Sequence, residues 1–240
     1  MEDFLIYDEF RRIVAVFDGH EGEIVARTCR DTIMGIIRDE ANMRLDHVLQ
    51  YVQERVMNTM INYPLQGTTA TVVRILSQNE IEIANVGDTS SILCCDENNN
   101  TIELSRDHLG RDVEERKRIE RAGGYVNEEG RVEGRLMITR ALGDLWGRHV
   151  GISSIPFYQV FTTNSNWEFL IVASDGVWDY VSFEMAKEIV RANGEGVEDD
   201  AMVLGRAVRA RSRASGGRSD NMAIVVVRNN GGECVGYDLE

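Results

Sequence analysis

The chain has 240 residues, 43% of them hydrophobic and 28% charged, a composition typical of globular proteins. Its 26 basic and 40 acidic residues give a formal net charge of −14, which argues against a nucleic-acid partner because phosphate backbones bind basic surfaces. No hydrophobic run approaches the roughly 20 residues of a membrane-spanning helix, and the N-terminus lacks the pattern of a signal peptide. Four cysteines without metal, redox or disulfide spacing favour an intracellular compartment, cytoplasmic or nuclear.

The first strong pattern is a hydrophobic run that ends in an acid. Residues 13–17, Ile-Val-Ala-Val-Phe, are typical of a buried strand, and Asp18-Gly19-His20 follows at once. An ionised carboxylate at the end of a buried strand requires compensation, and the adjacent glycine lets the backbone come close to a bound group. Because Asp-Gly is also a common turn dipeptide, this motif alone is weak evidence for a site.

Acids stand beside three further predicted strands. Together with Asp18 after residues 13–17, the acids are Asp88 after 81–86, Asp175 after 168–174, and Asp220 before 222–227. Four such acids predict a cluster of carboxylates at one edge of a sheet, which repels itself unless a multivalent cation binds there. Oxygen ligands favour magnesium, manganese or calcium over zinc.

Helical and strand periodicities alternate along the rest of the chain. Helices are predicted over 25–37, 45–61, 112–121, 183–190 and 197–208, and further strands over 67–73, 91–94 and 136–138. Residues 96–100 have the composition of a hairpin loop, whereas 145–159 and the residues from 229 on show no regular pattern. Consecutive strands with short connections predict antiparallel sheets, and no linker divides the chain into two domains.

Two features leave alternatives open at this point. Glu2 and Asp3 precede the first predicted strand, and they are either part of an exposed terminus or outer members of the carboxylate cluster. Basic residues gather over 116–121 and 206–218, as solvated helix faces or as a rim that attracts acidic or phosphorylated substrates.

Nine short motifs, in this order, resemble those of the metal-dependent serine/threonine protein phosphatases of type 2C. They are Met1-Glu2-Asp3, Val16-Phe17-Asp18-Gly19-His20, Gly67-Thr68-Thr69-Ala70, Asn85-Val86-Gly87-Asp88-Thr89, Asp107-His108, Arg121-Ala122-Gly123-Gly124, Arg140-Ala141-Leu142-Gly143-Asp144, Ala173-Ser174-Asp175-Gly176-Val177-Trp178-Asp179 and Ser219-Asp220-Asn221. Each motif is weak alone, but together they span essentially the whole chain and are highly specific.

The resemblance implies an α+β fold, a four-layer αββα sandwich in which two antiparallel sheets are flanked by helix pairs. It implies one phosphatase catalytic domain over 1–240, a monomer that acts on phosphorylated proteins and has no nucleic-acid or membrane partner. It also implies two Mn²⁺ or Mg²⁺ ions per chain and a weaker third. The implied ligands are the bridging Asp18, the Gly19 carbonyl, Asp175 and Asp220, with Glu2 and Asp3 partly through water, and Asp88 and Asp179 at the third ion.

The implied reaction is hydrolysis of phosphoserine or phosphothreonine by a water that the two metals activate. His20, next to the bridging Asp18, is the implied general acid for the leaving oxygen. We expect His108 to orient its loop and His47 to be a surface or packing residue.

One departure from the family concerns the N-terminus. In the family an arginine that contacts the substrate phosphate, and most of a strand, precede the Met-Glu-Asp motif, and both are absent here. We expect either a short form or compensation by another residue such as Arg12 or Arg140.

Two rival functions remain in view. A non-catalytic, phosphatase-like binding scaffold would be marked by the loss of metal ligands, yet the core acids and His20 are present. A calcium-binding module would leave His20 unexplained, and the chain has no calcium-loop spacing.

Overall fold

The computed structural model describes residues 2–95, 100–163, 167–194, 199–216, 220–230 and 233–239, with side chains through residue 229. Met1 and Ser219 of the motifs above lie outside these residues, as do most of the predicted loop over 96–100 and the start of the helix predicted over 197–208.

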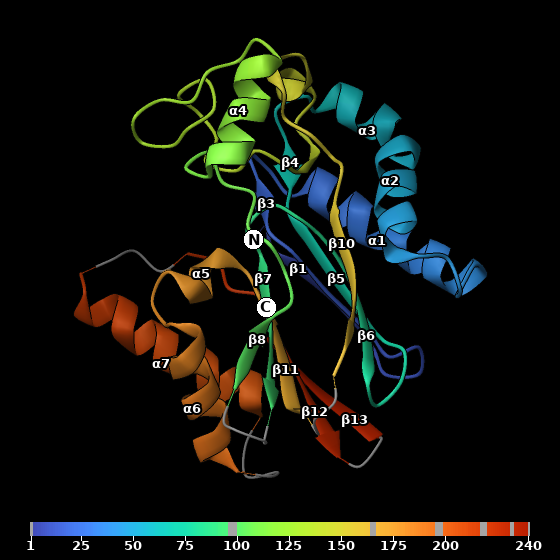
Figure 1. Cartoon of the computed structure of the whole chain (residues 1–240), viewed down its shortest axis with the longest axis vertical. Coiled ribbons are helices and arrows are strands. Elements are labelled where there is room, and N and C mark those ends of the chain that lie inside the picture. The colour runs from blue at the N-terminus through green and yellow to red at the C-terminus, as the bar shows by residue number, and fades with distance from the viewer. Residues whose placement is uncertain are drawn as a thin grey trace.

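Two five-stranded sheets form the centre of the molecule (Figure 1). The first has the order β1 (Phe4–Asp8), β2 (Ile13–Phe17), β5 (Ala70–Ile75), β6 (Glu80–Val86) and β10 (Phe157–Thr162). The second has the order β13 (Glu233–Leu239), β12 (Ile224–Asn230), β11 (Trp167–Ala173), β7 (Ser90–Cys95) and β8 (Thr101–Glu103). A small third sheet joins β3 (Gly19–His20), β4 (Gly67–Thr68) and β9 (Leu142–Gly143). All of these strand pairs are antiparallel, as the short connections predict.

The described residues also form several helices. They are α1 (Ile24–Asp39), α2 (Leu45–Arg55), α3 (Met57–Asn62), α4 (Val113–Arg121), α5 (Asp175–Trp178), α6 (Phe183–Asn193), α7 (Asp200–Ala214) and the 3₁₀ helix η2 (Leu145–Val150). Figure 1 shows α1, α2 and α3 on one side of the strands and α6 and α7 on the other, with α4 beyond the strand ends.

Side-chain alternation along single strands explains how the layers pack. In β2, Ala15 and Phe17 pack in a core with α1 and α2, whereas Val14 and Val16 pack in the core between the two sheets. In β11, Leu170 also faces the core between the sheets, and the residues on either side of it in sequence pack with α6 and α7. Both faces of these strands are therefore buried, which is why their sequences are continuous hydrophobic runs. The mixed helix-and-sheet fold predicted from the sequence is confirmed at this level.

The structure corrects several element predictions. Strands β1, β8, β10 and β13 were not predicted, and each lies at the edge of its sheet, where hydrophobic patterning is weaker. Residues 145–159, which show no regular pattern in the sequence, contain η2 and the start of β10, and the residues from 229 on include β13. The predicted helix over 45–61 divides into α2 and α3 at Val56. Residues 136–138 form only isolated bridges, Val132 to Leu136 and Leu109 to Ile138, and not a strand.

A buried ion pair joins α7 to the second sheet. Asp200, 1% exposed, accepts hydrogen bonds from Arg228 Nε at 2.6 Å and Nη2 at 2.9 Å, and the same guanidinium donates to the Val190 carbonyl of α6 at 3.0 Å. Such a pair contributes little net stability, because burial removes both charges from water, but the loss of one partner leaves the other uncompensated.

We therefore expect Asp200→Ala to lower the free energy of unfolding by about 3–5 kcal/mol, measured by urea denaturation. The double variant Asp200→Leu/Arg228→Met should recover most of that loss, because apolar side chains of similar volume replace a buried ion pair at little cost. Equal losses in the single and double variants would show that the pair itself is the stabilising feature.

Candidate functional site

Six of the predicted site acids meet in one cleft. The cleft is lined by Glu2, Asp3, Asp18, Asp88, Asp175 and Asp220, together with Gly19 and His20. The acids come from segments far apart in the chain: the residues before β1, the end of β2, the β6–β7 turn, the start of α5 and the residues before β12. The structure thus brings together the acids that the sequence placed beside separate strands.

Close backbone contacts at two glycines make this convergence possible. A Cβ atom on Gly19 would lie 2.5 Å from the Glu2 carbonyl oxygen, and a Cβ atom on Gly176 would clash with the Asn221 carbonyl oxygen. These contacts bring the N-terminal acids against Asp18 and bring the start of α5 against the Asp220 segment. Any larger residue at either position would push these segments apart.

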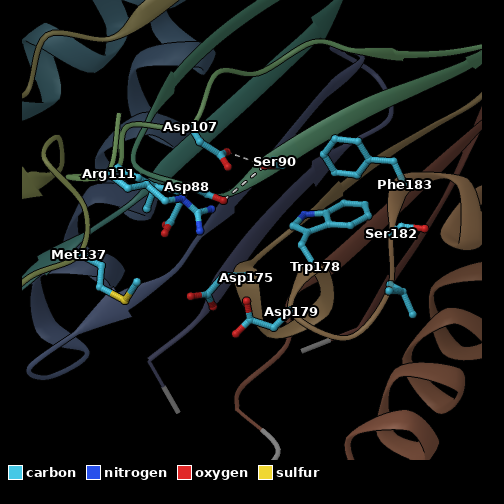
Figure 2. A pocket seen from close by; sticks show the side chains of 12 residues that line it. Asp88, Ser90, Asp107, Arg111, Met137, Asp175, Trp178, Asp179, Ser182 and Phe183 are labelled. Atoms are coloured by element: carbon cyan, nitrogen blue, oxygen red, sulfur yellow. Dashed lines mark hydrogen bonds between the residues drawn. The ribbon is translucent and has the colours of Figure 1, made fainter. Parts of the chain in front are cut away.

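A second pocket of about 420 Å³ adjoins the cleft and shares Asp88 and Asp175 with it. Figure 2 shows Asp179 beside Asp175 on one side of this pocket, and Asp107 and Arg111 near Asp88 on the other. Its apolar wall is Leu109, Met137, Trp178, Val181 and Phe183. The structure therefore places Asp179 next to the cleft and not inside it, and adds Asp107 to the acids of this region.

Burial and mutual repulsion raise the pKa values of the clustered acids. Burial, with the charges of Asp175 and Asp220, raises the pKa of Asp3 to about 6. Burial and the nearby Asp175 and Asp107 charges raise the pKa of Asp88 to about 7. Burial and the charges of Asp3 and Asp175 hold the pKa of Asp18 well above its usual range, and its carboxyl group is within hydrogen-bonding reach of that of Asp175.

This donor set has the chemistry that a hard divalent cation requires. Carboxylate oxygens suit Mg²⁺ and Mn²⁺, and the raised pKa values show that burial and mutual repulsion outweigh the positive charges near these acids. Within the described part of the chain, no group of three or more His, Cys, Asp or Glu side chains is already arranged to hold an ion. The acids are therefore gathered in one cleft without forming a closed ligand cage.

His20 is held at the cleft by a buried acid that sequence reasoning did not assign to the site. His20 Nε2 lies 2.8 Å from Asp144 Oδ2, and Trp146 Nε1 donates to Asp144 Oδ1 at 3.0 Å. Asp144 is 1% exposed and has a positive φ of 47°. Burial alone would lower the pKa of His20, but the hydrogen bond and charge of Asp144, with the charges of Asp88 and Glu2, raise it.

The small third sheet brings these two residues together. His20 pairs with Gly67 in β3–β4, and Gly67 pairs with Gly143, the residue before Asp144, in β4–β9. A Cβ atom on Gly67 would lie 2.6 Å from His20 Nε2 and would overlap Asp144 Oδ2. Because 124 positions separate His20 from Asp144, only this sheet, and no local spacing, reveals the pair.

Neither arginine suggested as a substitute for the family's phosphate contact lines the cleft. Arg12 occupies the β1–β2 turn with a φ of 54°, at the end of β2 opposite Asp18. Arg140 makes a bidentate ion pair with Glu115, with Nη2 at 2.6 Å and Nε at 3.1 Å. Hydrogen bonds from Arg140, Arg118 and Thr139 outweigh burial and lower the pKa of Glu115, so the Arg140 guanidinium is held in this network.

The remaining histidines of interest lie away from the chemistry. His108 is buried, and its Nδ1 lies 3.1 Å from the Gly87 carbonyl oxygen, so that it ties its loop to the β6–β7 turn. Burial and the nearby Arg140 charge lower the pKa of His108 to about 4. The His47 side chain is 60% exposed, as a surface position should be.

Comparisons with known proteins bear on both the fold and the family. Among solved structures, the serine-threonine phosphatase 2C from Toxoplasma gondii has a TM-score of 0.78 at 20% identity, covering 89% of this chain and 83% of that one, which shows the fold. A Caenorhabditis elegans sex determining protein also has a TM-score of 0.78, at 25% identity, covering 94% of this chain and 60% of that one. No helix in the described residues is long and apolar enough to span a membrane.

Curated relatives of higher identity carry phosphatase names. The chain is 34% identical to probable protein phosphatase 2C 27 of Oryza sativa subsp. japonica over 238 residues, and 33% identical to protein phosphatase 1L of Bos taurus over 199 residues. These alignments cover 92% and 75% of this chain but 65% and 54% of the relatives, so the chain spans between half and two thirds of their length. The model of the family described as protein phosphatase 2C matches residues 7–222, and the chain therefore belongs to the protein phosphatase 2C family.

Proposed function

We propose that the chain is a metal-dependent protein phosphatase that hydrolyses phosphoserine and phosphothreonine. The observation that carries the proposal is the single cleft in which acids from five separate segments surround a histidine paired with a buried carboxylate. Family membership supports the reaction class. The substrates would be phosphorylated proteins, and the chain would act as a monomer in the cytoplasm or nucleus.

The proposed architecture is one catalytic domain over residues 1–240, built as a four-layer αββα sandwich. Three hydrophobic clusters support it: one between α1–α2 and the first sheet, one between the sheets, and one between the second sheet and α6–α7. In this arrangement the strand ends that carry the acids meet at one edge of the two sheets.

The proposed cofactors are two Mn²⁺ or Mg²⁺ ions, with a weaker third. Asp18 and the Gly19 carbonyl, with Asp175 and Asp220, would hold the pair, and Glu2 and Asp3 would contribute partly through water. Asp88 and Asp179 would hold the third, and Asp107 lines the same pocket. When bound, such ions lower the pKa of a coordinated water and neutralise charge on phosphoryl oxygens.

The chain's own contribution to bond breaking is the proton held on His20. The Asp144 carboxylate accepts a hydrogen bond from Nε2 of His20. The other ring nitrogen, Nδ1, makes no hydrogen bond within the described residues, so it is the one left to donate to the leaving oxygen. The Asp144 carboxylate fixes the ring and favours its protonated form. A seryl or threonyl oxygen requires this proton because its alkoxide is a poor leaving group.

A non-catalytic scaffold is the alternative function, and the comparisons do not favour it. Its expected signature is the loss of ligand acids or of the histidine. Every predicted acid and His20 are present in or beside the cleft, and Asp144 retains its contact with the histidine.

We expect hydrolysis of a phosphothreonine peptide and of p-nitrophenyl phosphate only with added manganese or magnesium, and none with a chelator in excess. Asp175→Ala should raise the metal concentration that gives half-maximal activity, while circular dichroism shows an unchanged fold. The matched control is Asp31→Ala, because the Asp31 side chain is exposed on α1. Full metal-independent activity would contradict the proposal.

The raised pKa values predict how the metal-free chain responds to pH. The pKa values of Asp3 and Asp88 are about 6 and about 7 in the folded chain, against 3.8 in the unfolded chain. Their contribution to the free energy of unfolding is therefore fully present below pH 3.8 and is lost as the pH rises through the folded-state values. The pKa of His108 is lowered to about 4, so this one residue has the opposite effect and favours the folded chain more as the pH rises. We expect the melting temperature without metal to be lower at pH 7.5 than at pH 5, as measured by differential scanning fluorimetry.

Magnesium should abolish this pH dependence, because an ion that binds only the folded chain stabilises it most where the acids are charged. The isosteric Asp88→Asn variant should reduce the pH dependence without metal, since one raised carboxyl is removed. A melting temperature that rises between pH 5 and 7.5 in the metal-free chain would show that repulsion among the cleft acids does not control its stability.

The proton-donor role predicts a dependence on the leaving group. His20→Gln should slow phosphothreonine-peptide hydrolysis by roughly 10²–10⁴-fold, and p-nitrophenyl phosphate hydrolysis much less, because nitrophenolate leaves without a proton. Asp144→Asn should shift the two rates in the same unequal way, since it weakens the charge that holds His20 protonated. The measurement is the ratio of the two rates at saturating manganese. Equal losses on both substrates would show that His20 does not donate the proton to the leaving oxygen.

A further inference from the structure

The acidic cleft poses an electrostatic problem for any anionic substrate. A phosphate monoester carries about two negative charges near neutral pH, and six carboxylates line the cleft. The two tightly held ions proposed above would carry four positive charges against these six carboxylates, so an approaching phosphoryl group would still meet repulsion wherever the weaker third ion is absent. A fixed positive side chain at the cleft would lower that barrier, and a guanidinium matches phosphoryl geometry best.

Arg131 is the side chain in that position. Among the described residues that line the cleft, it carries the one guanidinium, and Leu136, Met137 and Ile138 line the same cleft. Arg111 lines the neighbouring pocket instead, where its charge acts on Asp107.

The contacts of Arg131 leave part of its guanidinium available. Nη1 donates to the Arg135 carbonyl oxygen at 2.8 Å, and Nε lies 3.8 Å from Glu129 Oε2, at a surface where the Glu129 side chain is 78% exposed. Nη2 makes no hydrogen bond to any described residue. The Arg131 side chain is 40% exposed, so an anion in the cleft can reach it without displacing a buried group.

The loop that carries Arg131 is held on both sides of it. The Asn127 side chain accepts from the Arg131 amide at 2.8 Å, and the Asn127 amide donates to the Arg131 carbonyl at 3.0 Å. The Val132 amide donates to the Leu136 carbonyl at 2.8 Å, and Gly130 supplies a turn with a φ of 83°. The backbone position of Arg131 is thus set before substrate binds, which reduces the ordering cost of a contact.

The same loop faces the His20 side of the cleft. Arg135 Nη2 lies 3.9 Å from Oε1 of Glu21, the residue after His20. The guanidinium carbon of Arg135 lies over the Trp146 ring, 4.9 Å from its centroid. Trp146 in turn donates to Asp144, the partner of His20. The loop that carries Arg131 therefore also contacts the residues around the proposed proton donor, and Arg131 and His20 line the same cleft.

We propose that Arg131 binds the phosphoryl group of the substrate, with its guanidinium donating charge-assisted hydrogen bonds to the phosphoryl oxygens. This inference rests on the proposed phosphatase function and adds to it the protein's own phosphate-binding cation. The contact is to the phosphate itself, so it applies to aryl phosphates, phosphopeptides and inorganic phosphate alike.

The test compares Arg131→Ala and Arg131→Lys with the wild type, and uses Arg111→Ala as the matched loss of a guanidinium nearby. We expect Arg131→Ala to raise the KM for p-nitrophenyl phosphate and for a phosphothreonine peptide by about tenfold, as expected for one lost charged contact. The dissociation constant of inorganic phosphate for the magnesium-loaded chain, measured by calorimetry, should rise by a similar factor. Arg131→Lys should recover part of the loss, and Arg111→Ala should change these values little.

The outcomes separate this inference from the phosphatase proposal. If the wild type lacks activity yet binds phosphate in a manner that Arg131→Ala weakens, the reaction is wrong and the contact stands. The proposed contact would be overturned if the wild type does not bind phosphate, or if Arg131→Ala leaves phosphate binding unchanged. It would also be overturned if Arg131→Ala raises the KM only for the peptide, or if Arg111→Ala weakens binding as much as Arg131→Ala does. An unchanged manganese requirement and melting temperature in Arg131→Ala exclude a loss of ligands or fold as the cause.

Discussion

Repulsion among carboxylates at the strand ends is the constraint on which this structure depends. Burial and neighbouring charges raise the pKa values of Asp3, Asp18 and Asp88, so the cleft is unfavourable when all its acids are charged. The rest of the fold opposes that cost, because strands buried on both faces and covered by helices fix where the acids lie. A cleft of this kind is stable near neutral pH only when cations or protons balance it.

Glycines turn this constraint into a defined geometry. Gly19 and Gly176 allow neighbouring backbone to approach where a side chain would block it, and each stands next to an acid of the cleft. Gly67 does the same for the contact between His20 and Asp144. The Asp-Gly pairs are therefore more than turn signals here, because the glycine sets how closely two distant segments meet at the site.

The sequence predicted best where both faces of an element are buried. The acids at the ends of β2 and β11 could be found because those strands are largely hydrophobic runs, and the acid after β6 because hydrophobic residues recur along that strand. The capping of α4 by Asp112 followed from its local sequence. Edge strands escaped prediction because half-exposed residues give a weaker pattern, as in β10. The pairing of His20 with Asp144 and the position of Arg131 depend on contacts between distant segments, which periodicity does not encode.

The distribution of positive charge separates structural from substrate-directed roles among the arginines. Arg140 and Arg228 are committed to the buried carboxylates of Glu115 and Asp200, and each links segments of the fold. Arg131 differs because its partners are a carbonyl oxygen and a distant, exposed carboxylate, neither of which neutralises it. In a chain with a net charge of −14, this guanidinium provides positive charge beside the six acids of the cleft. If the proposed ions and the proposed phosphate contact both hold, the carboxylates would attract the cations and the guanidinium would attract the phosphate, so the cleft would favour a metal and an anion bound together.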